Sequence, residues 1–204
     1  MFVLINNSVE RRRTLRLAVL LGGVALGLSW TTTARAATDL FLTWPGIVGT
    51  SQAAGHKGDI ELLSYSQNAS GPGVSGSGKQ QTTTPATCGQ ITIKKVIDTT
   101  SPVFLGKVLS GQVTTGSPAP VVFTFAHPPG NAGAQDVTFY TVTLRNVVPT
   151  SITQSDSFGD DTVVETIVLM ASQFVFTFTP QLPTGGSGAP ITSGWDCANN
   201  RALP

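Results

Sequence analysis

The feature that most constrains the fold is a series of short segments in which apolar and polar residues alternate. In "QFVFTFTP" (173–180), Phe174, Phe176 and Phe178 fall on one face, and "DVTFYTVTLRNV" (136–147) alternates over its whole length. Successive side chains of a β-strand point to opposite faces, so a period of two residues predicts strands with one buried face. Closely spaced strands of this kind predict a two-sheet antiparallel sandwich or barrel.

Seven segments are predicted as strands: 39–44, 59–66, 90–97, 121–126, 136–147, 162–170 and 173–180. Of these, 39–44 is an apolar run that ends at Pro45-Gly46, and 162–170 is apolar on both faces apart from Glu165. The Leu62-Leu63 step interrupts the alternation in 59–66 and predicts a bulge. The composition agrees, because the 204 residues include 22 glycines and 13 prolines and only 11% are charged, against roughly 25% in an ordinary soluble protein. Such a chain suits short strands and turns better than helices.

One segment, "SPVFLGKVLSG" (101–111), predicts a helix. Ser101 is placed as the N-cap, Pro102 occupies the first helical position, and Gly111 lies just past the end. Phe104, Leu105, Val108 and Leu109 fall on one face at helical spacing, and we expect this face to pack on the β core rather than to bind a partner. Two other segments, 68–87 and 184–194, are low in complexity and predict loops.

The first 36 residues are typical of a secretory signal peptide. Four arginines between Arg11 and Arg16 precede the apolar run 17–28, and small residues at Ala34 and Ala36 predict cleavage after Ala36. The apolar run is too short for a membrane anchor, which needs roughly 20 residues. The paired arginines also permit twin-arginine export, although the general secretory route fits the flanking residues better.

Removal of this leader would leave a mature domain of residues 37–204, which we expect to be secreted or periplasmic and without stable membrane insertion. Five of the 12 basic residues and one of the 11 acidic residues would leave, which gives seven against ten and a net charge of −3. This charge argues against nucleic-acid binding. Cys88 and Cys197 both remain, and an oxidising compartment favours a disulfide between them. Two unpaired thiols are the alternative.

A catalytic, cofactor or metal site is not visible in the sequence. The chain has two histidines, His56 and His127, and lacks the H-E-x-x-H, G-x-S-x-G, P-loop and dinucleotide-binding motifs. Asp156, Asp160 and Asp161 could offer oxygens to calcium, but a turn stabilised by aspartate side chains fits better. Asn68-Ala69-Ser70 matches a glycosylation sequon, which matters only in a eukaryotic secretory pathway.

Four segments in order resemble the haemolysin-coregulated protein (Hcp) family, the inner-tube subunits of bacterial type VI secretion. Residues 39–66 include "PGIVGTSQAAGHKGDIELLSYS", and 91–111 resemble the family's strand, Ser-Pro turn and helix. Residues 142–181 resemble its long closing hairpin, and "SGWDCANN" (193–200) its terminal strand.

This resemblance implies a two-sheet β-barrel with one short flanking helix and no catalysis. It also implies six-membered rings that stack as a tube, carry small effectors and meet a spike protein. Loop 68–87 takes the place of the family's ring-contacting loop. The candidate subunit contacts are therefore His56, Lys57, Asp59, Glu61 and Lys79, with a solvated-turn role as the alternative for the first four.

Two features are additional to the family pattern, namely the leader of residues 1–36 and the pair Cys88 and Cys197. They favour a second hypothesis, a stand-alone periplasmic or secreted module that keeps the fold and is exported by its own signal. A hydrolase and an outer-membrane barrel fit less well. Two histidines give little support to a hydrolase, and several strands are shorter than the roughly ten residues of a membrane strand.

Overall fold

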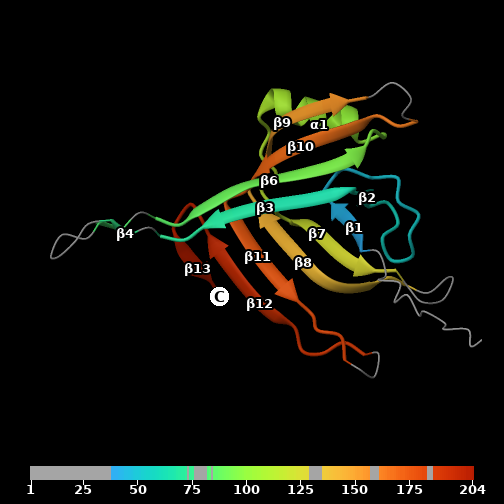
Figure 1. Ribbon diagram of the computed structural model, residues 1–204. Coiled ribbons are helices and arrows are strands. Elements are labelled where there is room, and N and C mark those ends of the chain that lie inside the picture. Colours follow the sequence, from blue (N-terminus) through green and yellow to red (C-terminus); the bar gives the residue numbers. More distant parts are fainter. Residues whose placement is uncertain are drawn as a thin grey trace, which may run out of the picture. The chain divides into compact units, whose positions relative to one another are not determined.

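A computed structural model describes residues 38–72, 74–75, 82–83, 85–128, 135–156, 161–182 and 186–204. Most strands of this part of the chain lie in two antiparallel sheets (Figure 1). The predicted leader lies outside the described residues. None of the described helices combines the length and apolar character needed to cross a membrane.

The larger sheet has seven strands in the order β13-β12-β11-β8-β7-β1-β2. Their bounds are β13 (Arg201–Leu203), β12 (Ile191–Asp196), β11 (Gln173–Phe178), β8 (Val137–Arg145), β7 (Val121–His127), β1 (Asp39–Thr43) and β2 (Ile60–Glu61). Alternation in the sequence produces this sheet, since Leu42, Phe123 and Val142 are direct cross-strand neighbours and all are fully buried. β13 and β2 form its two edges.

The smaller sheet has four strands in the order β3-β6-β10-β9. Their bounds are β3 (Ser64–Ser70), β6 (Thr87–Val96), β10 (Val164–Met170) and β9 (Val148–Ser155), and the helix α1 (Ser101–Ser110) packs against β9. A separate two-stranded ribbon, β4 (Val74–Ser75) with β5 (Thr82–Thr83), lies within the predicted loop 68–87. Because β3 and β6 are paired as far as Ser70 and Thr87, this segment continues the β3–β6 hairpin.

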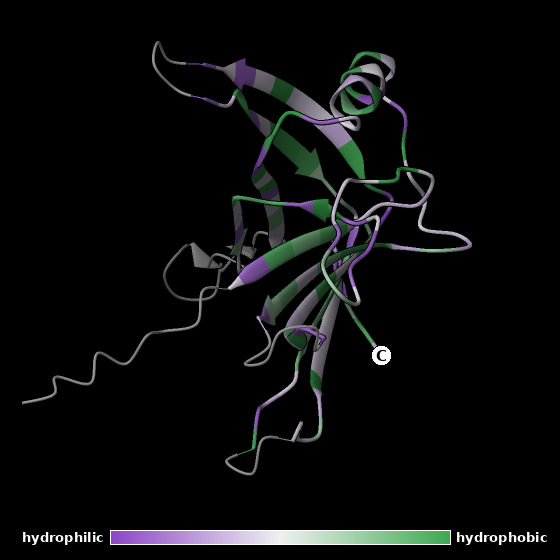
Figure 2. Cartoon of the chain, turned by 90° about the vertical axis from the view of Figure 1, so that its right-hand side faces the viewer, coloured by the Kyte–Doolittle hydropathy of each residue, from purple (hydrophilic) through white to green (hydrophobic). Residues whose placement is uncertain are grey.

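The core lies between the inner faces of the two sheets. Ile91, Ile93, Ile167 and Leu169 of the smaller sheet belong to the same buried cluster as Phe123 and its neighbours in the larger sheet. Figure 2 shows hydrophobic and hydrophilic residues alternating as bands along the strands. This is the pattern expected when two sheets each bury one face.

The chain passes from the larger sheet to the smaller one at Leu62 and Leu63. The Leu62 backbone N–H donates to the Leu40 carbonyl of β1 at 2.9 Å, whereas the Leu63 N–H donates to the Lys94 carbonyl of β6 at 2.7 Å. The predicted strand 59–66 is therefore wrong as a single element. The interrupted alternation marks a change of sheet, which places Leu62 in the core and leaves Leu63 exposed.

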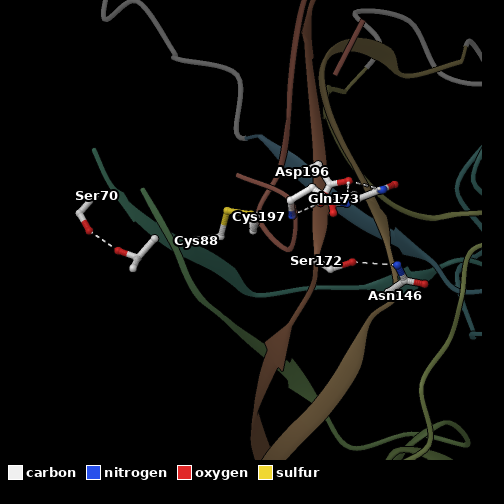
Figure 3. Close-up of a disulfide and its surroundings, with 9 residues drawn as sticks. Ser70, Cys88, Asn146, Ser172, Gln173, Asp196 and Cys197 are labelled. Carbon is white, nitrogen blue, oxygen red and sulfur yellow. Dashed lines mark hydrogen bonds between the residues drawn. A yellow bond between two sulfur atoms is a disulfide. The ribbon is translucent and has the colours of Figure 1, made fainter. Parts of the chain in front are cut away.

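Two further crossings lie next to each other, at the β8–β9 and β10–β11 connections. The Asn146 side-chain amide donates to the Ser172 hydroxyl at 2.8 Å, and the Ser172 N–H donates to the Arg145 carbonyl at 3.2 Å. The Cys197 N–H in turn donates to the Ser172 carbonyl at 2.8 Å. These hydrogen bonds fix the turns that join the sheets at this corner (Figure 3).

The predicted fold class is confirmed: the chain is mainly β, with two antiparallel sheets and one short helix. Within the described strands the two sheets stay separate rather than forming one continuous barrel wall. Strands β9, β12 and β13 were not predicted by alternation. In β9 the sequence "VPTSITQS" is polar and mostly exposed, so it carries little period-two signal.

The helix lies where it was predicted, but its ends and its faces differ in part. Thr100, not Ser101, is the N-cap, and Gly111 ends the helix with a left-handed φ of 62°. Of the predicted apolar face, Phe104 is fully buried and packs edge-on against Trp44 at 5.2 Å between ring centroids. Leu105 and Leu109 are exposed, so the expectation that the whole face packs on the core is wrong.

Candidate functional site

The turn between β1 and β2 holds three of the five predicted subunit-contact residues, His56, Lys57 and Asp59, and Glu61 follows on β2. The Asp59 carboxylate accepts a hydrogen bond from the Thr43 hydroxyl at 2.8 Å and lies 3.0 Å from His56 Nδ1. The His56 ring stacks on Phe41, with centroids 4.1 Å apart and planes within 4°. His56 and Asp59 thus tie the turn to β1 and cover an otherwise exposed aromatic ring.

Lys57 and Glu61 are exposed, in contrast to these two neighbours, and remain candidates for contact with another molecule. Glu61 lies on the edge strand β2, opposite Phe41 of β1. Burial and the nearby carboxylates of Asp136 and Glu61 raise the pKa of Asp39 on β1, although His56 acts in the opposite direction. Lys79 lies outside the described residues.

A buried ion-pair network, absent from the sequence-based predictions, connects the smaller sheet to the start of α1. Lys95 and Glu165 are both fully buried, and Lys95 Nζ lies 2.9 Å from Glu165 Oε1 and 2.8 Å from Asp98 Oδ1. The Ser101 hydroxyl donates to Glu165 at 2.9 Å and accepts from the Asp98 N–H at 3.0 Å. Gln154 Nε2 donates to the second Glu165 oxygen at 3.1 Å.

This network explains why Ser101 is not the helix cap. Its hydroxyl is directed into the buried network, and the Asp98 carboxylate accepts from the Thr100 N–H and hydroxyl instead, at 2.8 and 2.6 Å. A buried charge is stable only when it is paired and its remaining hydrogen bonds are satisfied. The network thus holds the Asp98–Ser101 turn, and with it the first turn of α1, against β6 and β10.

Asp98 gives the network a pH dependence. Burial opposes ionisation of Asp98, but hydrogen bonds from Lys95 and Thr100 outweigh it and lower its pKa. Its ionised form therefore stabilises the fold above the unfolded pKa of about 3.9, and this contribution is lost as pH falls through the lower folded value. We expect Asp98→Asn to destabilise the protein at pH 7 and much less at pH 2, measured by urea unfolding. A difference from the unchanged protein that stays constant with pH would contradict this.

Cys88 and Cys197 form a disulfide that joins the two sheets (Figure 3). Their Cα atoms are 6.0 Å apart, within the usual range for a disulfide. Cys88 lies on β6, paired with Ala69 of β3, and is near the base of the extended hairpin. Cys197 follows β12, in a turn where buried Asp196 accepts hydrogen bonds from Asn199 and Gln173. Oxidation of the pair in the cell remains a prediction.

The remaining candidate residues do not come together as a metal-binding group in the part of the chain that the structure describes. Its histidines, cysteines and carboxylates include no group of three arranged to hold a metal ion. Asp156 and Asp161 are exposed, and Asp160 lies outside the described residues. The His127 ring stacks on Phe139 with centroids 4.3 Å apart.

A family model described as type VI secretion system effector, Hcp, matches residues 41–178, more than half of the chain. The chain belongs to this Hcp family. The matched region of this Hcp protein runs from β1 to β11 and includes α1, the buried network and the turn between β1 and β2. No curated protein matches the chain in sequence.

Solved structures share the fold. One, described as a type six secretion system protein, is 22% identical with a TM-score of 0.71, covering 82% of this chain and 100% of that one. Hcp1 from Salmonella typhimurium is 23% identical with a TM-score of 0.62, covering 82% of this chain and 99% of its own. Hcp2 from the same organism is 21% identical with a TM-score of 0.56, with coverages of 80% and 98%. The predicted Hcp-like fold and family are thus confirmed.

Proposed function

We propose that this Hcp protein is a ring-forming structural subunit of a type VI secretion tube, without catalytic activity. In this role six copies close into a ring, rings stack, small effector proteins travel in the lumen, and a spike-type protein meets the end of the tube. The observation that carries the proposal is the family match, which covers the helix, the whole smaller sheet and the larger sheet apart from β12 and β13.

The distribution of apolar side chains supports self-association. Leu109 on α1 is 79% exposed, and Leu63, Leu105 and Ile97 are also exposed although the chain is poor in charge. Leu105 and Leu109 are one helical turn apart on α1 and are therefore neighbours on its surface. Contiguous exposed apolar patches mark contact surfaces. A closed ring also requires two different surfaces on each copy, because head-to-tail contacts are what generate rings.

The exposed face of α1 gives a direct test of association. We expect Leu109→Asp to weaken assembly by at least about tenfold in dissociation constant, since it places a charge in an apolar contact. Leu109→Met is the matched control and should assemble normally. Analytical ultracentrifugation measures the effect, and the melting temperature of each variant shows that the subunit itself is intact. Normal assembly of Leu109→Asp would show that this face of α1 is not part of the interface between copies.

The leader and the cysteine pair favour one alternative, a stand-alone module exported by its own signal peptide. N-terminal sequencing of protein from the periplasm and culture fluid tests the leader, and Ala37 as the first residue is the expected result. Deletion of the type VI machinery then separates the two functions. A tube subunit should disappear from the culture fluid in the deletion strain, whereas a stand-alone module should still be exported.

A further inference from the structure

The two edges of the seven-stranded sheet differ in charge. At one edge, β13 ends the sheet with Arg201, Ala202 and Leu203, and Arg201 is exposed. Arg201 has no carboxylate within salt-bridge distance in the described part of the chain, although Asp196 is its cross-strand neighbour. This edge therefore presents an unpaired cation.

The opposite edge adjoins a recess whose carboxylates come from β2 and from the segment that follows β6 of the smaller sheet. A pocket of about 250 Å³ next to β2 is lined by two acidic residues, Glu61 and Asp98, and by the exposed apolar side chains of Leu63, Val96 and Ile97. Lys95 and Thr100 donate hydrogen bonds to Asp98 Oδ1. The other carboxylate oxygen, Oδ2, accepts no hydrogen bond within the described residues. Glu61 makes no ion pair there either.

This combination suits an arginine side chain. The methylene stem of arginine packs on apolar surface while its guanidinium pairs with carboxylates, and arginine is enriched in such anchoring positions. The strands at both edges are short, three residues in β13 and two in β2, so side chains rather than a new backbone ladder would dominate the contact.

We propose that copies of this chain associate head to tail through these two edges, with Arg201 of one copy inserted between Glu61 and Asp98 of the next. The edges lie at opposite ends of one sheet (Figure 1), so a single contact leaves the pair of copies with one free edge of each kind. Repetition of such a contact closes a ring when the rotation per copy allows it. This inference rests on the proposed function and adds the surfaces that meet.

The test is a charge reversal on each edge. Arg201→Glu and Glu61→Arg should each weaken assembly by at least about tenfold, because like charges then face each other. The double variant Arg201→Glu with Glu61→Arg should recover assembly, and so should an equimolar mixture of the two single variants, in which every contact again joins opposite charges. Asp161→Arg, the same charge change at an exposed site elsewhere, is the control and should assemble normally.

Native mass spectrometry of the exported protein at low salt gives the readout. Assembly of the unchanged protein together with normal assembly of either single variant would overturn this inference and leave the proposed function standing. Failure of both the double variant and the mixture to recover would also overturn it, because the two edges would then not meet. A protein that stays monomeric without any substitution would overturn both.

Discussion

Replacing Lys95 with methionine is expected to lower the free energy of unfolding by about 3–5 kcal/mol. The substitution leaves Glu165 fully buried without its cation, with only Ser101 and Gln154 as hydrogen-bond partners. A buried carboxylate without a cation beside it has lost its hydration and gained no opposing charge, so it destabilises the folded state unless it takes up a proton. Equilibrium unfolding in urea measures the loss.

The neighbouring residue supplies a matched control. Lys94 precedes Lys95 on β6 but is exposed, so Lys94→Met should change stability by no more than about 0.5 kcal/mol. Adding Glu165→Leu to Lys95→Met should recover part of the loss, because replacing both charges with apolar groups removes the unpaired carboxylate. If Lys95→Met and Lys94→Met have equal effects, the ion pair between Lys95 and Glu165 does not stabilise the fold.

Removal of the disulfide is expected to have a comparable effect. Cys88 and Cys197 are 109 residues apart in sequence, and closing a loop of this length in the unfolded chain corresponds to roughly 4–5 kcal/mol in the chain-entropy model. The double variant Cys88→Ser with Cys197→Ser should therefore unfold at markedly lower denaturant concentration than the oxidised protein. The double variant avoids the free thiol that either single substitution would leave.

Reductant provides the control for this prediction. The unchanged protein should gain two mass units on reduction and then unfold at the same denaturant concentration as the double variant. The double variant should not respond to reductant at all. A protein isolated from the periplasm with two free thiols would contradict the prediction, and it would also weaken the case for an oxidising compartment.

The strands with clear alternation could be predicted because a strand that buries one face needs an apolar residue at every second position. Phe174 and Phe176 show this in β11, where the first is buried and the second packs against the core. Family membership could be predicted as well, from four motifs in the right order that no single strand pattern provides. Polar strands such as β9 show neither the alternation nor a distinctive motif of their own, so their positions could be found only in the structure.

The buried network was missed even though part of its signal is present. Lys95 continues the alternation of Ile91 and Ile93, and Glu165 continues that of Ile167 and Leu169, so both charges fall on the inward faces of adjacent strands. An inward lysine facing an inward glutamate in register predicts a buried pair. The register Glu165 to Lys95 comes from sheet pairing, which sequence periodicity alone does not provide.

The exposed face of α1 was mispredicted for a related reason. Helical spacing shows that apolar residues share a face, but not whether that face meets the core or another molecule. In this chain Phe104 alone among the four predicted residues is fully buried, Val108 is half-buried, and Leu105 and Leu109 are exposed. Leu105 and Leu109 are therefore available for the contact between copies that we propose.

The central claim, that this protein works by assembling into rings, is tested most directly by native mass spectrometry of the unmodified exported protein over a range of concentrations. We expect one dominant species with the mass of six mature chains, each linked internally by one disulfide. A single-chain mass at every concentration, up to the highest the instrument accepts, would contradict the claim.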